Sequence, residues 1–587
     1  MKKSVVSLII ASALLVAATP SHAAKAFNPS APIKAQGQLG TVFVDAYGVA
    51  PQTAVIDLGG FKIEAAKVVV HGKGKDGIDI KYDVDHADIL NHNGVPIFGL
   101  YADFNNTVTL TYTKSGKKVT EDYRIYTAPR VSGTPSDGMR NNAPVIQPVK
   151  VADEFKDRLY LINHIFETPN SGALAWKGNM GAQNWSGKNN IFITDTKGEV
   201  RWTLDTSQFE NYKDITQRGI MMGFHQLDNG DLIWGKGQQL FRMDMFGKVV
   251  WDWDLPRGYI DFSHEIQAMD NGHYLVRAAK ADYLRDDGKR VHTVRDHILE
   301  LDENGRLVDV WDLNIILDNL RDDLLLALDV GAVCLNVDNE HAGETVEVEL
   351  DAPFSDIPGV GAGRNWAHVN SIDHDSSDDS IILSLRHQGV VKINRDKSVK
   401  WILSPKSGWN KALASKLLTP VDSKGKKISC TDNGACEGDF DFTYTQHTAW
   451  LTGKTYQNGK VKGLSVFDNG DGRHLEQPAL KSMKYSRAVE YKVNEKDMTV
   501  EQVWEFGKDR GNEWYSAITS NVSFQEDKNS MFIFSANTRL QQKGVLTRGV
   551  INEVEYNTDN VLVEMDVISP LPGNAPYRAT IINPDLL

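Results

Sequence analysis

The chain has 587 residues and a formal net charge of −13 at pH 7, with a sequence pI near 5.7. This acidic balance argues against nucleic acid and against a membrane surface as partners, because both are bound by basic patches. An anionic ligand would therefore depend on local cations. The length allows several cores, and a hydrophobic content of 41% fits a large β protein.

The N-terminus has the composition of a secretory signal peptide. Two lysines precede an apolar run from Val5 to Ala18, and a small-residue cleavage site ends at Ala23. The run is shorter than the roughly 18 apolar residues that a membrane span needs. A permanent N-terminal anchor is the alternative, but no stop-transfer flank follows the run. We therefore expect residues 1–23 to be removed and the mature protein to be exported.

A small β-domain is predicted for residues 24–135. It contains short alternating runs such as TVFVDAY, AAKVVVHG and IDIKYDV, separated by turns rich in Gly and Asn. This pattern is typical of a β-sandwich. The link SGTPSDGMRNNAPVIQP then separates it from a second domain, which we place at 136–587.

One turn-and-strand pattern recurs through the second domain. The form D-x-x-G-x-V-x-W ends at Trp202 and again at Trp251, a spacing a little under 50 residues. Looser copies begin at Asp302 and Asn394, follow Val493, and lie near Tyr556. Asp or Asn starts each turn, and the tryptophan can wedge between neighbouring sheets. Six copies at this spacing predict an all-β fold with a six-bladed β-propeller, in which these residues have structural roles.

Each turn follows a β-run that is also repeated, as DLIWG, HYLVRAA, SIILSLR and SMFIFSA. Two larger gaps between copies indicate insertions. The segment after Trp311, DLNIILDNLRDDLLLALDVGAV, has helical periodicity, and SPKSGWNKALASKLLTP lengthens the fifth unit. We expect these insertions to cover one face of the ring.

Four of the repeated units contain a histidine in a polar stretch: His225, His264, His368 and His447. The first strand of a propeller blade lines the axis, so a polar residue at its start faces the channel. The last three histidines hold this position, whereas His225 lies nearer its turn and is interpreted as a structural neighbour. Arg386 ends the run SIILSLR in the unit of His368. Imidazoles with a guanidinium suit a tetrahedral oxyanion.

Three alternatives compete with an oxyanion site. Converging histidines can hold zinc or copper, as in a metal-dependent hydrolase, although the arginine would repel a cation. The repeated turn is similar to the Asp-box of sialidases, but an arginine triad and a tyrosine nucleophile are not found. A non-catalytic binding or assembly scaffold would tolerate loss of the histidines and carry an exposed apolar patch.

The chain has three cysteines, Cys334, Cys430 and Cys436. The last two flank the turn TDNGA, so a small-loop disulfide is predicted in an oxidising compartment. Cys334 is left over and is interpreted as a buried thiol.

The segments FSHEIQ, NWAHVNSI, LSLRHQG and YTQHTAW occur in this order, together with the signal peptide, the small β-domain and the loop CTDNGAC. This combination resembles the bacterial arylsulfate sulfotransferases of the periplasmic type over essentially the whole mature chain. The resemblance implies a β-sandwich followed by a six-bladed propeller, a periplasmic location and a homodimer. It also implies a disulfide between Cys430 and Cys436 that depends on a periplasmic thiol oxidase.

The same resemblance implies an activity and its residues. The family moves a sulfuryl group from a phenolic sulfate ester to an acceptor phenol without a nucleotide donor. Its transiently sulfated histidine matches His447, and its other active-site residues match His264, His368 and Arg386. We expect a ping-pong reaction in which neutral His447 attacks sulfur and the other imidazoles move protons. Because the donor already carries an activated sulfuryl group, we expect no metal, nucleotide or other cofactor.

Overall fold

The computed structural model describes residues 36–130, 143–165, 174–177, 180–183, 189–209, 219–284, 290–319, 321, 323–324, 366–476, 480–540, 544–571 and 574–587. The predicted signal peptide, the predicted domain boundary at 135 and Cys334 lie outside these ranges. Among the described helices, none has the length and apolar character needed to cross a membrane.

The N-terminal domain consists of two antiparallel sheets. One has the order β1 (Val42–Val44), β2 (Ala54–Asp57), β5 (Gly94–Ile97), and the other has the order β4 (Ile80–Val84), β3 (Ala66–Val70), β6 (Phe104–Lys114), β7 (Lys117–Thr127). Strands β3 and β4 alternate buried and more exposed residues, so each covers the core with one face. Helix α1 (His86–His92) begins at a capping box made by Asp85 and Asp88. The predicted small β-domain is thus present.

Six further antiparallel sheets follow, and the first three are arranged from the centre outward. The first contains β36 (Ala575–Ile582), β9 (Leu159–Ile165), β12 (Asn189–Asp195) and β13 (Val200–Thr203). The second contains β14 (Met221–Gln226), β15 (Leu232–Lys236), β16 (Gln239–Met243) and β17 (Val249–Asp254). The third contains β18 (Tyr259–Ile260) and β19 (Ile266–Ala268), both paired with β20 (Tyr274–Leu284), then β21 (Arg290–Leu301) and β22 (Leu307–Asp312).

The remaining three sheets have the same plan. The fourth contains β23 (Val369–Asp375), β24 (Ser380–Leu385), β25 (Gly389–Ile393) and β26 (Val399–Leu403). The fifth contains β28 (Thr448–Tyr456), β29 (Val461–Asp468), β30 (Arg487–Asn494), β31 (Thr499–Phe506) and the short β27 (Thr419–Pro420). The sixth contains β32 (Asn521–Gln525), β33 (Ser530–Thr538), β34 (Arg548–Glu555), β35 (Val561–Ile568) and β8 (Val145–Val151). A separate hairpin joins β10 (Leu174–Lys177) and β11 (Met180–Gln183).

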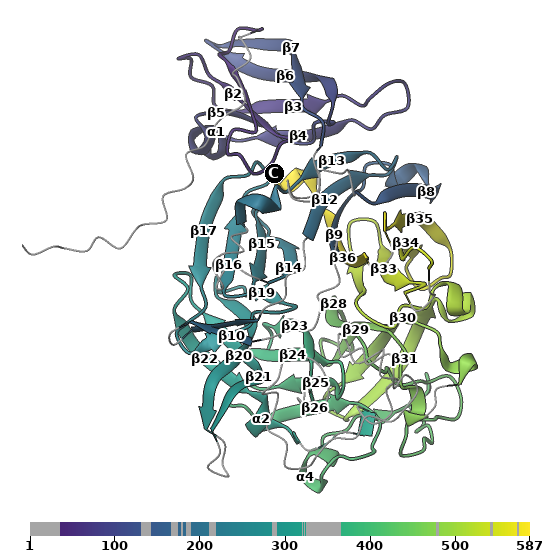
Figure 1. Ribbon diagram of the computed structural model, residues 1–587. Helices are drawn as coiled ribbons and strands as arrows, with labels where there is room; N and C mark the ends of the chain where they lie inside the picture. Colours follow the sequence, from purple (N-terminus) through teal and green to yellow (C-terminus); the bar gives the residue numbers. More distant parts are fainter. Residues whose placement is uncertain are drawn as a thin grey trace, which may run out of the picture.

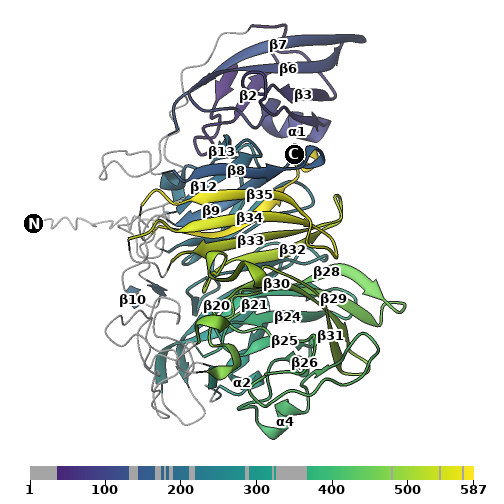
Figure 2. The ribbon, with the colours of Figure 1, turned by 90° about the vertical axis from the view of Figure 1, so that its right-hand side faces the viewer.

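The two ends of the second domain are joined by strand pairing. Strand β36 pairs with β9 in the first sheet, and β8 pairs with β35 in the sixth. The innermost strands β14, β19, β23, β28 and β32 contact one another in series, and β36 contacts both β33 and β14. In Figure 1 the six sheets lie around a common centre with the N-terminal domain above them, and Figure 2 shows the same stack from the side. The prediction of an all-β, propeller-like protein is therefore confirmed.

The repeated turns join the outer strands of these sheets. In the first copy, Asp195 Oδ1 accepts the backbone N–H groups of Lys197 and Glu199, at 2.9 and 3.1 Å. In the second copy, Asp244 Oδ1 does the same for Phe246 and Lys248, each at 2.9 Å. The carboxylate therefore satisfies the turn's own donors, as an Asx turn requires.

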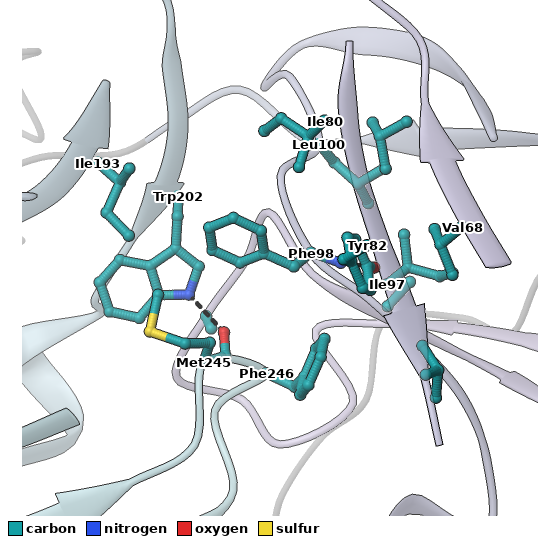
Figure 3. Close-up of a cluster of buried hydrophobic side chains, with 14 of the residues drawn as sticks. Val68, Ile80, Tyr82, Ile97, Phe98, Leu100, Ile193, Trp202, Met245 and Phe246 are labelled. Carbon is teal, nitrogen blue, oxygen red and sulfur yellow. Dashed lines mark hydrogen bonds between the residues drawn. The ribbon is translucent and has the colours of Figure 1, made fainter. Parts of the chain in front are cut away.

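The repeated tryptophans bind the next sheet. Trp202 donates its indole N–H to the Met245 carbonyl at 2.9 Å, within the turn of the second sheet (Figure 3). The same link recurs between later neighbours: Trp311 to the Asn394 carbonyl at 3.3 Å, Trp401 to Glu495 Oε1 at 3.0 Å, and Trp504 to the Thr558 carbonyl at 2.9 Å. Trp251 differs, because it stacks on Trp253 with ring centroids 3.6 Å apart. The structural role predicted for these residues follows from the links.

The two insertions are only partly visible. Within the described residues, the segment after Trp311 contains the four-residue helix α2 (Leu313–Ile316), and its remainder beyond 324 lies outside them. The second insertion contains α4 (Lys411–Ala414) and β27, which adds to the outer edge of the fifth sheet. Cys430 and Cys436 form the predicted disulfide, with their Cα atoms 4.0 Å apart.

Candidate active site

Three of the predicted histidines meet at the centre of the second domain. His264, His368 and His447 lie directly before or near the starts of the innermost strands β19, β23 and β28. The ring centroids of His264 and His368 are 5.0 Å apart, and those of His264 and His447 are 5.7 Å apart. His264 and His368 both have left-handed backbone, with φ of 72° and 54°. Such φ values are strained for non-glycine residues and need support from their surroundings.

The tautomer of His447 follows from its hydrogen bond. Its Nδ1 lies 3.0 Å from the carbonyl oxygen of Ser520. A carbonyl oxygen only accepts, so Nδ1 carries the hydrogen and Nε2 has the free lone pair. The side chain is buried, and Nε2 has no hydrogen-bond partner among the described residues. Burial, followed by the charge of Arg578, holds the pKa of His447 well below its usual range. The imidazole is therefore neutral at neutral pH.

His264 and His368 form a second unit. Their Nε2 atoms are 3.3 Å apart, so one of them carries the hydrogen and the other accepts it. His264 Nδ1 also bonds to the hydroxyl of Ser263. Burial and the neighbouring His264 keep the pKa of His368 well below its usual range. Any proton that this pair gains is therefore better accommodated on His264 than on His368.

Arg386 lies beside these imidazoles and is completely buried. Its Nη1 and Nη2 donate to the carbonyls of Thr445 and Ala517, at 2.9 and 3.0 Å. Its backbone N–H donates to the carbonyl of His368 at 3.0 Å. The charge of Arg386 contributes, after burial and the nearer charges, to the lowered pKa of both His368 and His447. The structure thus brings all four predicted residues together.

Residues of the last strand also reach this cluster, and sequence reasoning did not find them. The ring of Tyr577 on β36 lies 5.4 Å from that of His447 and 6.2 Å from that of His264. The adjacent Arg578 donates from Nη2 to the carbonyl of His447 at 3.3 Å. Strand β36 carries no histidine and is no copy of the repeat. Its place at the centre becomes visible only once it is paired with β9.

His225 lies apart from the other three histidines. It is within β14, and its Nε2 is 2.5 Å from Oε1 of the buried Glu265. It lines a cavity of about 230 Å³ together with Asp373, Trp450, Tyr577 and Arg578. The prediction that His225 is out of register with the others agrees with this placement.

Metal binding was the chemical alternative for the histidines. In the described part of the chain, one group of side chains brings its oxygen atoms close enough for a shared ion: Asp375, Asp378 and Glu495. The ammonium of Lys392 bonds to all three, at 3.0 Å for Asp378 and 2.6 Å for Glu495. That group is therefore already occupied by a protein cation.

Comparison with known proteins places the chain in a family. The family described as Arylsulfotransferase (ASST) matches residues 145–578, and the arylsulfotransferase Ig-like domain matches residues 41–128. The Arylsulfate sulfotransferase AssT of Escherichia coli O6:H1 is 49% identical, over 99% of this chain and 98% of that protein. The chain belongs to the arylsulfotransferase family. It is accordingly an aryl-sulfate sulfotransferase.

Further relatives agree with this arylsulfotransferase assignment. The Arylsulfate sulfotransferase AssT of Lelliottia amnigena is 48% identical, again over 99% of this chain and 98% of that protein. Among solved structures, the WD40 domain of Toxoplasma gondii coronin covers 72% of this chain and 89% of its own, with 8% identity and a TM-score of 0.27. The fold described above rests on the arylsulfotransferase's own strand pairing.

Proposed function

We propose that this arylsulfotransferase moves a sulfuryl group from an aryl sulfate donor to a phenolic acceptor through a sulfohistidine at His447, without a nucleotide donor. The observation that carries the proposal is the lone pair on His447 Nε2, which is buried, aimed by the Ser520 carbonyl and kept neutral. A neutral imidazole nitrogen of this kind is a nucleophile.

In the first half-reaction, His447 Nε2 forms a bond to sulfur while the bond from sulfur to the phenolic oxygen breaks. The leaving phenolate takes a proton from the His264–His368 pair. A phenol has a pKa near 10, so its departure at neutral pH needs such a donor. Arg386 and the charged pair stabilise the sulfuryl oxygens as negative charge moves to the leaving oxygen.

In the second half-reaction, the acceptor phenol attacks the same sulfur. Its hydroxyl proton returns to the His264–His368 pair as the bond between nitrogen and sulfur breaks. The pair ends with the proton that it lost in the first step, and His447 is again neutral. The distance of 3.3 Å between the two Nε2 atoms supports this shared use of one proton.

Mass spectrometry of the intact protein tests the nucleophile. After incubation with a chromogenic aryl sulfate and no acceptor, the protein should gain the mass of one SO₃ group. The variant His447→Ala should gain nothing, whereas His86→Ala, a change on α1 at a side chain that is 53% exposed, should gain it as wild type does. An adduct that persists in His447→Ala would refute the assignment.

Two alternative functions have their own outcomes. If dialysis against EDTA abolished transfer and zinc restored it, the histidines would be metal ligands and the mechanism would be wrong. If His447→Ala, His264→Ala and Arg386→Ala all retained transfer, the central cluster would be structural and the protein's activity would lie elsewhere. We expect full activity after EDTA and no transfer by His447→Ala.

The proposal extends to architecture and location. The serial contacts of the innermost strands support a closed six-bladed propeller behind a β-sandwich. The N-terminal pattern and the Cys430–Cys436 bridge support export to the periplasm, with the bridge made by a thiol oxidase. N-terminal sequencing of the periplasmic protein should begin at residue 24. Light scattering should give the mass of the homodimer that family resemblance implies.

A further inference from the structure

The guanidinium of Arg578 on β36 is buried and binds three separate segments. Its Nη1 donates to Glu265 Oε2 at 2.9 Å. Its Nη2 donates to the carbonyl of Asn370 and to the carbonyl of His447, the latter at 3.3 Å. The side chain is 10% exposed and the Glu265 carboxylate is fully buried, so the ion pair is shielded from water.

These three partners belong to the three histidine segments. Glu265 directly follows His264, Asn370 lies two residues after His368, and the third partner is the carbonyl of His447 itself. One side chain therefore fixes the backbone of each segment that carries an imidazole. Two of these segments contain the left-handed histidines, whose conformation needs external support.

We propose that Arg578 is a positioning residue that holds the three histidine segments in the arrangement required for sulfuryl transfer. This inference rests on the function proposed above. The guanidinium suits the task because its planar donors bind a carboxylate and two carbonyls at once. A lysine has the same charge but offers a single ammonium that does not span the same three partners.

The position of Arg578 also has an electrostatic consequence for His447. The groups that act on this imidazole are Arg578 from β36, His264, Arg386 and the Ser520 carbonyl, with Tyr577 packed on its ring. The Glu265 carboxylate lies on the far side of Arg578 and also binds His225. Removing the cation should raise the pKa of His447. Removing the Glu265 charge should lower it further.

Three variants separate geometry from charge. In Arg578→Met, kcat should fall about 10- to 100-fold because the segments shift, and the acid limb of kcat/KM should move about one pH unit upward. In Arg578→Lys, kcat should fall similarly while the acid limb stays near the wild-type position. In Glu265→Gln, the acid limb should move to lower pH, opposite to Arg578→Met.

A matched control removes another arginine–carboxylate pair. Arg510 donates to Glu564 Oε2 at 2.8 Å, and Glu564 lies on β35, the strand of the sixth sheet next to β8. Arg510→Met should lower the melting temperature without moving the pH limb. The positioning role is overturned if Arg578→Met keeps the wild-type kcat and limb, or if its loss of kcat follows melting temperature as in Arg510→Met with the limb unmoved. If Arg578→Met does not fold, the opposite limbs of Arg578→Lys and Glu265→Gln decide.

The SO₃ adduct separates this inference from the proposed function. If the wild-type protein forms no adduct, the sulfohistidine mechanism fails and Arg578 has no such reaction to support. If the wild type forms the adduct and Arg578→Met forms it at an equal rate over the same pH range, only the positioning role fails. We expect the adduct in both, but formed about 10- to 100-fold more slowly in Arg578→Met.

Discussion

His447 Nδ1 donates its hydrogen to the carbonyl of Ser520, 3.0 Å away in the next sheet of the ring. This one bond fixes which nitrogen of His447 is a nucleophile. Ser520 has a left-handed backbone with φ of 85°, and its hydroxyl bonds to Ser516 at 3.0 Å. The acceptor is thus held by its own neighbours, so the imidazole cannot turn without breaking a buried hydrogen bond.

The acid limb of the pH–rate profile should lie below pH 6.5, the usual pKa of histidine. Burial and nearby cations lower the pKa of His447, so the neutral nucleophile persists as the pH falls. The measurement is kcat/KM for an aryl sulfate donor between pH 4.5 and 8, since that ratio reports the free enzyme. An acid limb at or above pH 6.5 would contradict the neutral, buried imidazole.

Acid should destabilise the fold through His164. This side chain on β9 is fully buried against Ser569 Oγ at 3.0 Å, and burial lowers its pKa to about 3. The unfolded chain binds the proton below pH 6.5 and the folded chain does not. The stability is therefore complete above pH 6.5 and is lost as the pH falls towards 3. Between pH 6.5 and 5 the loss is about 2 kcal/mol.

His164→Asn tests this source of acid sensitivity. The amide keeps a hydrogen-bonding group but does not titrate, so the variant should lose about 2 kcal/mol less than wild type between pH 7.5 and 5. Urea unfolding at both pH values gives the difference. Equal losses in the two proteins would show that His164 is charged in the folded state.

Trp202→Ala should cost about 3–5 kcal/mol of unfolding free energy. The ring is completely buried between the first and second sheets and packs near Phe98 and Phe246 of the domain interface (Figure 3). Trp253→Ala is the control, because that indole is only partly buried. Denaturant unfolding measures both. A cost for Trp202→Ala no larger than that for Trp253→Ala would remove the intersheet role of the repeated tryptophan.

The sequence predicted the architecture better than the site. Repeated turns and tryptophans are local signals, because Asp195 satisfies its own turn and Trp202 reaches only the next copy. The histidines were found because they recur at one register. Arg578 and Tyr577 were missed because their role depends on β36 pairing with β9, more than 400 positions earlier in the chain. The orientation of His447 was also invisible, since its partner is a backbone carbonyl.

Reducing the Cys430–Cys436 disulfide should lower both stability and activity. The bridge closes a loop with a sequence separation of 6, so the loss should be about 2 kcal/mol. The loop contacts the histidine segment directly, because Tyr444 donates its hydroxyl to the Asn433 carbonyl at 2.8 Å. Tyr444 lies three residues before His447. A loosened loop should therefore disturb His447 and lower kcat.

The double variant Cys430→Ser, Cys436→Ser separates the bridge from general effects of a reductant. Its melting temperature and kcat should match those of the reduced wild type and should not change further when dithiothreitol is added. Tyr444→Phe keeps the bridge but removes the hydrogen bond to Asn433, so it should lower kcat more than stability. If the double variant were as active and as stable as the oxidised wild type, the bridge would have no influence on the His447 segment. If only its stability fell, the loop would stabilise the fifth sheet without positioning the nucleophile.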